Sequence, residues 1–294
     1  MNKLAISINK NLVHQLISKQ FPEWKELTIQ AVAVSGWDNR TFHLGDEMLV
    51  RLPSAACYAG QVEKEAHWLP MLAPHLPVKI PAPLALGKPT KDYPWPWGIY
   101  RWLVGETVAA TPDIDLSILA EDLANFLFSL HRIDSTGGPA PGLHSFYRGG
   151  SLAVYDEETQ KALSHLKNNI DSLAAMELWQ SALKTSWRKA PVWVHGDISA
   201  GNLLIEHGKL SAVIDFGQLS IGDPACDLAI TWTLFKDQSR AIFKTKLALD
   251  DDTWIRAKAW TLWKALVTAA GFTNPNNAEA KQCWNIIHDV LNDT

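Results

Sequence analysis

Three polar side chains with the chemistry of a metal–phosphate site lie on either side of one predicted hairpin. Asp197 and Asn202 share a Gly-containing loop, and Asp215 ends the strand that returns. Because a hairpin brings its two ends together, we expect Asn202 and Asp215 to be neighbours. Amide and carboxylate oxygens suit Mg²⁺ with bound phosphates, whereas Zn²⁺ prefers thiolates or clustered histidines. The pattern predicts a Mg²⁺ site beside a second carboxylate, that of Asp197.

These side chains belong to two motifs, HGDISAGN at 195–202 and IDFG at 214–217. The pair resembles the catalytic loop and the metal loop of the protein-kinase-like fold. The His-Gly-Asp spelling, and GDPACDLA at 222–229, are similar to the aminoglycoside phosphotransferase family and its macrolide, choline and homoserine kinase relatives. The resemblance covers about residues 28–235. It implies that Asp197 is the catalytic base or orients the acceptor hydroxyl, and that Asn202 and Asp215 hold Mg²⁺ on the nucleotide phosphates.

The same resemblance implies a cation on an early strand, paired with a carboxylate on the next helix. The matching cation is Arg51, where many relatives have Lys. Its planar fork suits bidentate contacts that the compact ammonium of Lys cannot copy. Glu65 is the expected partner. Glu63 is the alternative, since two positions along a helix place it on another face.

Two further segments resemble nucleotide contacts of the family. Ser35 and Gly36 stand in the loop 35–39, where relatives cover the nucleotide, and their backbone N–H groups are expected to contact phosphates. A plain hairpin turn is the alternative for this loop. Tyr100, Trp102 and Leu103 resemble the strand-to-hinge segment that hydrogen-bonds the nucleobase through its backbone. Backbone recognition does not separate ATP from GTP, so ATP is expected by default and GTP stays possible.

The elements that position these residues fall into two parts. Short β-favourable runs and one helix come first, at 28–34, 40–44, 47–52, 61–72 and 98–104. The Pro-rich stretch 74–83 predicts extended loop and edge strand, because each proline lacks a backbone donor. Helical periodicity follows at 115–130, 156–189, 252–270 and 277–291, around a β island at 192–214. We expect an α+β, bilobal protein-kinase-like fold, with a small β-rich nucleotide-binding lobe (1–103) and a larger, mainly helical catalytic and substrate-binding lobe (104–294).

Composition excludes several other classes. The 294 residues carry 27 basic and 31 acidic side chains, a net charge of −4, without a strongly basic half. This argues against a nucleic-acid partner held by phosphate contacts. No apolar run is long enough to span a membrane, and no secretory leader is evident. Three cysteines far apart in the sequence predict neither a disulfide framework nor a CxxC metal site. We expect a cytoplasmic protein, monomeric or homodimeric.

The predicted function is Mg²⁺- and ATP-dependent transfer of phosphate to a hydroxyl of a small molecule, first an aminoglycoside-type antibiotic. The alternatives are a macrolide phosphotransferase, a housekeeping kinase of the choline or homoserine type, and a non-catalytic, pseudokinase-like nucleotide-binding protein. Intact Asp197, Asn202 and Asp215 argue against the last. Asp227 has two open roles, to brace the catalytic loop or to cap the helix that follows.

The acceptor pocket is expected in the helical lobe. An acidic pocket would suit polycationic acceptors, and the candidate carboxylates are Asp156, Glu157, Glu158, Asp250, Asp251, Asp252, Asp289 and Asp293. Most such residues are solvated helix starts, and Asp252 is expected to cap a helix. The tryptophans of the C-terminal helices are expected mainly in the core, with a sugar- or macrolide-binding face as the alternative.

Overall fold

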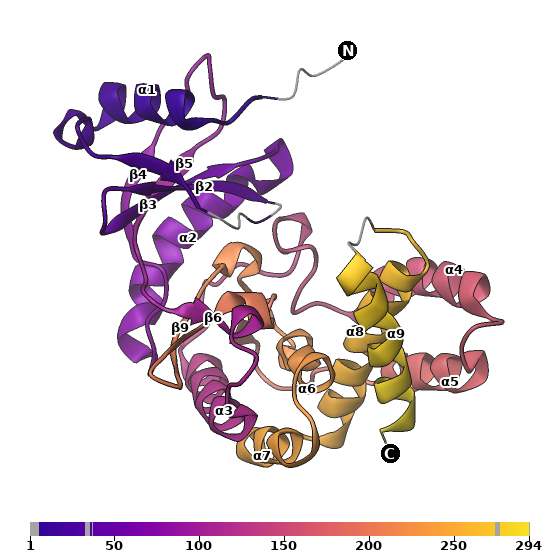
Figure 1. Cartoon of the computed structure of the whole chain (residues 1–294). Helices are drawn as coiled ribbons and strands as arrows, with labels where there is room; N and C mark the ends of the chain where they lie inside the picture. The colour runs from indigo at the N-terminus through magenta and orange to yellow at the C-terminus, as the bar shows by residue number, and fades with distance from the viewer. Residues whose placement is uncertain (1–5, 33–35, 37, 274–276, 294) are drawn as a thin grey trace. The chain divides into compact units, whose positions relative to one another are not determined.

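The structure is a computed structural model that describes residues 6–32, 36, 38–273 and 277–293 (Figure 1). It divides into two compact units. Unit 1 contains the described residues up to Gly105 together with Ala212–Gly217, and unit 2 contains Glu106–Ser211 and the described residues from Gln218 onward. The short segment Ala212–Gly217 therefore belongs with the N-terminal unit, whereas the division predicted from the sequence assigns it to the second lobe.

Unit 1 is built on one antiparallel sheet of five strands. Its strands are β1 (Ile29–Ala31), β2 (Asn39–Leu44), β3 (Met48–Pro53), β4 (Pro83–Gly87) and β5 (Trp97–Arg101). The order across the sheet is β1-β2-β3-β5-β4. The Pro-rich stretch thus leads into an edge strand, as predicted. Proline has no backbone N–H and cannot donate a hydrogen bond to a second neighbouring strand. Two helices complete the unit, α1 (Lys10–Gln20) and α2 (Ala59–Leu72).

The alternation of side chains along β3 and β5 gives this sheet two different faces. Val50, Leu52 and Ile99 join the apolar side of α1 in one buried core. Successive side chains of a strand point to opposite faces, so Arg51 and Tyr100 project toward the other side. That side carries α2, and the two helices lie on opposite faces of the sheet in Figure 1.

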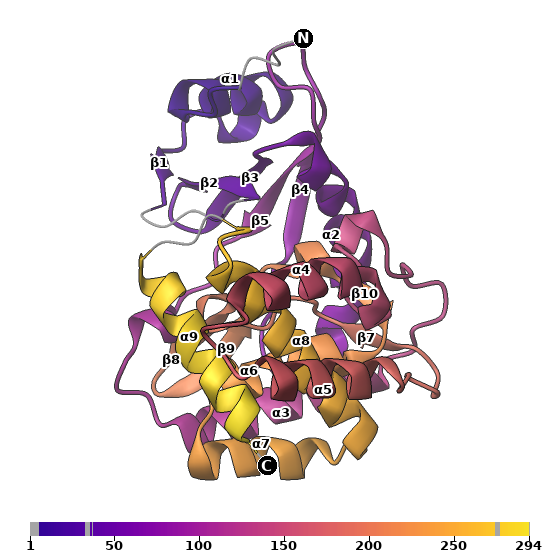
Figure 2. The ribbon, with the colours of Figure 1, turned by 90° about the vertical axis from the view of Figure 1, so that its right-hand side faces the viewer.

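Unit 2 is mainly helical. Its helices are α3 (Leu116–Arg132), α4 (Asp156–Leu166), α5 (Ser172–Leu183), α6 (Ile230–Thr233), α7 (Asp237–Leu247), α8 (Asp251–Ala269) and α9 (Asn277–Asn292). The predicted helical stretch 156–189 is two helices rather than one, and the residues after Leu183 are not helical. Helix α8 is buried along most of its length, because α4, α5 and α9 all pack against it (Figure 2).

Short strands flank the two loops that carry the HGD and IDFG motifs. The antiparallel pair β7 (Val192–Val194) and β10 (Ser220–Gly222) flanks the HGD motif, and β6 (Glu106–Thr107), β8 (Leu203–Glu206) and β9 (Lys209–Val213) form a three-stranded sheet. His207 and Gly208 both have positive φ, 54° and 75°, the geometry that a two-residue hairpin turn needs. The predicted hairpin is therefore present. The chain is α+β, as predicted, and no helix among the described residues is long and apolar enough to cross a membrane.

Candidate active site

Arg51 is the centre of an ionic cluster in unit 1. Its Nη1 donates to both carboxylate oxygens of Glu65, at 3.0 and 3.1 Å, and its Nη2 donates to Asp215 Oδ1 at 2.9 Å. Asp38 Oδ2 lies 4.0 Å from the same Nη2. Glu63, the alternative partner, is exposed on another face of α2. The guanidinium thus connects the third strand, helix α2 and the metal loop.

Tyr100 contacts both members of the Arg51–Glu65 pair. Its hydroxyl donates to Glu65 Oε2 at 2.7 Å, and its ring lies under the Arg51 guanidinium, 5.6 Å from the ring centroid. The ring reaches this place across Gly98, which pairs with Arg51, because a Cβ at 98 would lie 2.4 Å from the Tyr100 ring. The side chain of Tyr100 therefore orients Glu65, a role that the sequence analysis did not assign.

Electrostatics keeps Arg51 charged. Burial acts to lower its pKa, but the charges of Glu65 and Asp215 outweigh burial and raise it well above the ordinary value. Burial, and then repulsion by Asp215, raise the pKa of Asp38 to about 6, although Arg51 acts in the opposite direction. Burial raises the pKa of Tyr100 as well, so its hydroxyl remains a donor. One cation thus stabilises several partly or fully buried carboxylates.

The metal loop joins unit 1 through β9. Val213 N–H donates to the Lys79 carbonyl at 3.0 Å, and two residues later Asp215 has a φ of 69°, in the left-handed region. Asp tolerates this region better than bulky residues. The Gln61 side chain of α2 packs over Gly217, where an added Cβ would lie 2.8 Å from Gln61 Oε1. A side chain at 217 would therefore have to displace the end of the Gln61 side chain.

The residues expected to contact the nucleotide differ in whether their backbone N–H and C=O groups already have hydrogen-bond partners. Ser35 lies outside the described residues, and the exposed Gly36 accepts a hydrogen bond from Arg40 at its carbonyl. The strand residue Tyr100 pairs on both sides, and Trp102 N–H donates to the Glu47 carbonyl at 2.7 Å. Within the described part of the chain, Leu103 has no partner for its backbone N–H or C=O. Its backbone is available to a ligand.

The catalytic loop of unit 2 is held by one buried carboxylate. Asp227 accepts hydrogen bonds from the backbone N–H groups of His195 and Gly196, both at 2.7 Å. It therefore braces the loop, and it does not cap the helix that follows, because the N-cap of α6 is Ala229 and no side chain caps that helix. Burial raises the pKa of Asp227, although its interaction with His195 and these two hydrogen bonds act in the opposite direction. His195 is fully buried and its Nδ1 accepts from Asp197 N–H at 3.1 Å.

Asp197 and Asn202 lie together in this loop. Asn202 Nδ2 donates to the carbonyl of Asp197 at 2.9 Å and to its Oδ2 at 3.2 Å. Because the amide nitrogen is engaged, the amide oxygen is the atom that remains for a cation. Asp215 belongs to unit 1, so its contacts are those described above.

The donor atoms fit Mg²⁺. They are one amide oxygen and one carboxylate, and Mg²⁺ is usually held by one or two carboxylates together with substrate phosphates. No group of three or more His, Cys, Asp or Glu able to hold a metal occurs among the described residues, so an all-protein cage is not what they offer. Asn202 in unit 2 and Asp215 in unit 1 each offer an oxygen of the kind that Mg²⁺ binds together with phosphates.

Gly196 explains the His-Gly-Asp spelling. Its φ is 87°, and a Cβ at this position would lie 2.7 Å from the carbonyl oxygen of Gln218 and 3.1 Å from Arg148 Cβ. A side chain here would be strained and would collide with backbone. The absence of a side chain at 196 lets Arg148 pack directly against the loop.

The candidate acceptor carboxylates separate into structural and pocket-lining ones. Asp250, rather than the expected Asp252, caps α8, and Asp289 and Asp293 form ion pairs with Arg240. Asp156 accepts from Trp179 Nε1 at 2.7 Å. These contacts are structural. Asp251 and Asp252 are exposed in the first turn of α8, and Glu157 and Glu158 line a pocket.

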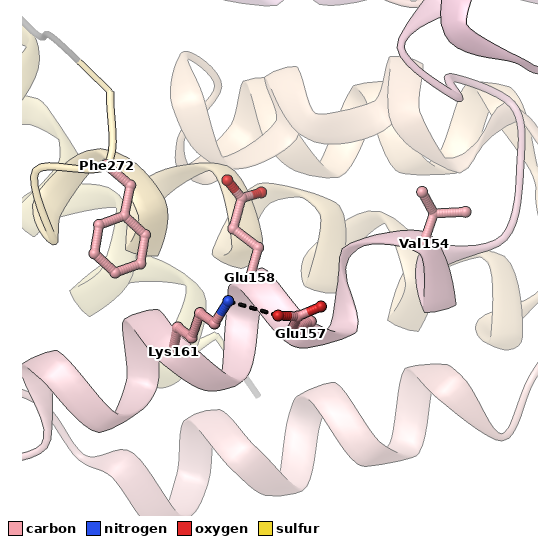
Figure 3. A pocket seen from close by; sticks show the side chains of 5 residues that line it. All are labelled: Val154, Glu157, Glu158, Lys161 and Phe272. Carbon is pink, nitrogen blue, oxygen red and sulfur yellow. Dashed lines mark hydrogen bonds and ion pairs between the residues drawn. The ribbon is translucent and has the colours of Figure 1, made fainter.

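That pocket, of about 470 Å³, lies in unit 2 and opens widely to solvent. Its lining residues are Val154, Glu157, Glu158, Lys161 and Phe272 (Figure 3). Glu157 is paired with Lys161 at 2.5 Å, and Glu158 accepts from the Trp263 indole at 2.9 Å. Of the C-terminal tryptophans, Trp232, Trp254, Trp260 and Trp263 are buried and only Trp284 among these is exposed, so most are core, as predicted.

The sequence profile of the phosphotransferase enzyme family matches residues 28–260 of this chain. The chain belongs to the phosphotransferase enzyme family. A stretch of 47 residues of the phosphotransferase is 45% identical to an aminoglycoside 3'-phosphotransferase of Escherichia coli, covering 16% of this chain and 17% of that relative. The chain thus aligns with less than a fifth of that curated relative's length.

Solved structures resemble this chain over nearly its whole length. The GDP and kanamycin complex of an aminoglycoside phosphotransferase has a TM-score of 0.72 and 20% identity, covering 97% of this chain and 100% of the other. A macrolide 2'-phosphotransferase of Brachybacterium faecium has a TM-score of 0.59 and 19% identity, covering 97% and 98%. The chain therefore has the fold of these proteins, and the predicted fold class is confirmed.

Proposed function

We propose that this phosphotransferase transfers the terminal phosphoryl group of ATP, with Mg²⁺, to a hydroxyl group of a small molecule. The observation that supports this most directly is the Arg51–Glu65 pair with Asp215 on its other nitrogen. Kinase-like enzymes position a nucleoside triphosphate with a cation held by a helix carboxylate, next to the Asp that binds the metal. The Asp227 brace under Asp197 and Asn202 supports the same reading.

Each residue has a defined part in this proposal. Asp197 orients the acceptor hydroxyl and accepts its proton, Asn202 and Asp215 hold the cation, and Arg51 contacts the phosphates. Leu103 hydrogen-bonds the nucleobase through its backbone; Ser35, Gly36, Tyr100 and Trp102 stay predictions. Held by Asn202 and Asp215, Mg²⁺ would neutralise negative charge on the phosphate oxygens. The hydroxyl oxygen bonds to the γ-phosphorus, the bond to the bridging oxygen breaks, and the nucleoside diphosphate leaves with that electron pair.

The acceptor class to test first is the aminoglycosides, because the curated relative and the GDP and kanamycin complex both carry that name. The acidic edge of the pocket at Glu157 and Glu158 is compatible with a cationic acceptor. A macrolide is the second candidate, since a macrolide 2'-phosphotransferase shares the fold over nearly the whole chain. The GDP in the solved relative makes GTP a donor to compare with ATP.

The test is nucleotide turnover with Mg²⁺, using ATP and GTP in parallel and a panel of aminoglycosides, macrolides and amino alcohols. We expect one class to stimulate turnover, and Asp197→Asn to abolish transfer while nucleotide binding is kept. Asp113→Asn changes an exposed carboxylate without a role in the site and is the matched control. Near-normal transfer by Asp197→Asn would contradict the role given to Asp197. Nucleotide binding without stimulation by any acceptor would favour the pseudokinase-like alternative.

A further inference from the structure

Arg148 lies beside the catalytic loop on a platform of aromatic rings. Its guanidinium is 5.0 Å from the Trp260 ring centroid and 5.2 Å from that of Trp263, both on α8. Its Nε donates to Gln218 Oε1 at 3.0 Å. Its Cβ is 3.1 Å from the position that a side chain of Gly196 would take, so Arg148 directly borders the loop that carries Asp197.

A second cation stands on the same helix. Lys264 follows Trp263 on α8, and its side chain is exposed. Four positions separate Lys264 from Trp260 on α8, so the two side chains lie on the same face of the helix. Desolvation, and then repulsion by Arg148, lower the pKa of Lys264, while the carboxylates of Asp197 and Glu158 act to raise it.

Neither Arg148 nor Lys264 forms an ion pair with a carboxylate in the part of the chain that the structure describes. For the half-buried Arg148 this is unlike the other enclosed arginines. Arg51, Arg240 and Arg256 each form an ion pair with at least one Asp or Glu. A half-buried arginine is costly unless an anion balances its charge.

A neutral donor at this place also lacks an acceptor. Trp260 is 3% exposed, and its buried Nε1 has no hydrogen-bond partner, in the same ring that carries Arg148. Its neighbour Trp263 shows the ordinary arrangement, with Nε1 donating to Glu158. Buried polar groups are normally hydrogen-bonded, so the Trp260 donor in the ring below Arg148 is suited to an anionic acceptor.

We propose that Arg148, Lys264 and the Trp260 indole N–H form a subsite for a phosphate- or carboxylate-type oxyanion on the acceptor side of Asp197. The proposal rests on the proposed function and refines its acceptor. The oxyanion has two possible sources, which share this chemistry. It is either an anionic group that the acceptor already carries or the phosphate that the acceptor has just received.

The first experiment uses inorganic phosphate and needs no turnover. The indole N–H signals of the protein are followed by NMR during a phosphate titration, with Trp260 assigned through Trp260→Phe. We expect a saturable shift of the Trp260 signal, and phosphate affinity at least tenfold weaker in Arg148→Met. Lys264→Met, at an exposed position that should not disturb folding, is expected to weaken binding as well. The matched control is Arg132→Met, since Arg132 also lies over an aromatic ring, Phe128, at 5.2 Å, and is expected to change nothing.

A Trp260 signal that does not respond to phosphate, or that responds equally in the wild type, Arg148→Met and Lys264→Met, would overturn the subsite. Because this measurement is independent of catalysis, it separates the subsite from the proposed function. Phosphate binding at Trp260 in a protein that turns over no acceptor would count against the proposed function and for the subsite.

Kinetics then distinguish the two sources. If the acceptor carries the anion, Arg148→Met raises the KM for the acceptor at least tenfold and changes kcat little. If the anion is the transferred phosphate, Arg148→Met leaves that KM unchanged, lowers kcat and weakens binding of the phosphorylated product. A variant with unchanged KM, kcat and product affinity would overturn the subsite.

Discussion

Replacing Arg51 tests the ionic cluster without knowledge of the acceptor. Two variants separate charge from geometry. Arg51→Met removes the cation from Glu65, which is almost fully buried, and from Asp215. Arg51→Lys keeps the charge but replaces a planar fork with one compact ammonium.

The size of each effect follows from the contacts. Removing one partner of a buried ion pair costs about 3–5 kcal/mol, because a buried charge is left without compensation. The hydroxyl of Tyr100 still donates to Glu65, so we expect Arg51→Met to lose roughly 3 kcal/mol, the lower end. An ammonium cannot reproduce the contacts to Glu65 at 3.0 and 3.1 Å and to Asp215 at 2.9 Å together. Losing one charge-assisted hydrogen bond makes Arg51→Lys less stable by about 1.5–3 kcal/mol.

The measurements are urea unfolding of the protein without nucleotide and nucleotide affinity by calorimetry. Arg101→Met is the control, an exposed arginine on β5 in the same sheet. Arg51→Lys should bind nucleotide within roughly tenfold of the wild type, about 1.4 kcal/mol. If Arg51→Met were as stable as Arg101→Met, Glu65 and Asp215 would not depend on Arg51 and the reasoning would fail. Complete loss of nucleotide binding in Arg51→Lys would mean that the fork contacts phosphate in a way that Lys cannot copy.

Three further predictions concern stability. Gly222→Ala should lose more than about 4 kcal/mol in urea unfolding, because the φ of Gly222 is 155° and its new Cβ would lie 2.1 Å from the Gly149 carbonyl oxygen; a soluble, fully stable variant would refute this. Asp227→Asn should lose about 2–3 kcal/mol, since the amide nitrogen that replaces one carboxylate oxygen faces a backbone N–H of the loop and cannot accept from it; unchanged unfolding would show that the brace is dispensable. Asp250→Ala should lose about 1 kcal/mol at pH 7 through the lost helix cap on Thr253. Burial acts to raise the pKa of Asp250, but its hydrogen bonds hold that pKa below the usual 3.8. The stability from this carboxylate is therefore present above about pH 4 and is lost as the pH falls further, so the difference between variant and wild type should shrink in acid; a difference independent of pH would contradict the cap.

The parts of the site that lie close together in sequence could be predicted well. The pairing of Arg51 with Glu65 was expected from the resemblance to the kinase-like family, and the structure has it. The hairpin between Asn202 and Asp215 follows from its Gly208 turn. Helix α1 was not predicted, although Asn9, which accepts from Leu12 N–H, and the apolar positions after it carry a helix signal.

Contacts between distant segments could not be predicted in the same way. The sequence around Tyr100 predicts a strand and a hinge. Its hydrogen bond to Glu65 depends on how β5 packs against α2, which the sequence does not give. Either role of Asp227 fits a local pattern, and only the path of the chain places it under His195. Arg148 has no motif around it, because the rings beneath it come from α8, more than a hundred residues later.

The assignment of Ala212–Gly217 to unit 1 has a consequence for synthesis on the ribosome. The sheet and α2 emerge first, yet the unit lacks Asp215 and the partner of the Lys79 carbonyl until most of unit 2 has been translated. Domains of large proteins generally fold as they emerge, N-terminal first. Here the nascent N-terminal unit cannot be completed until Ala212–Gly217 has been synthesised, and until then Arg51 lacks its contact with Asp215. Cutting the chain after Gly105 therefore does not produce a complete first unit.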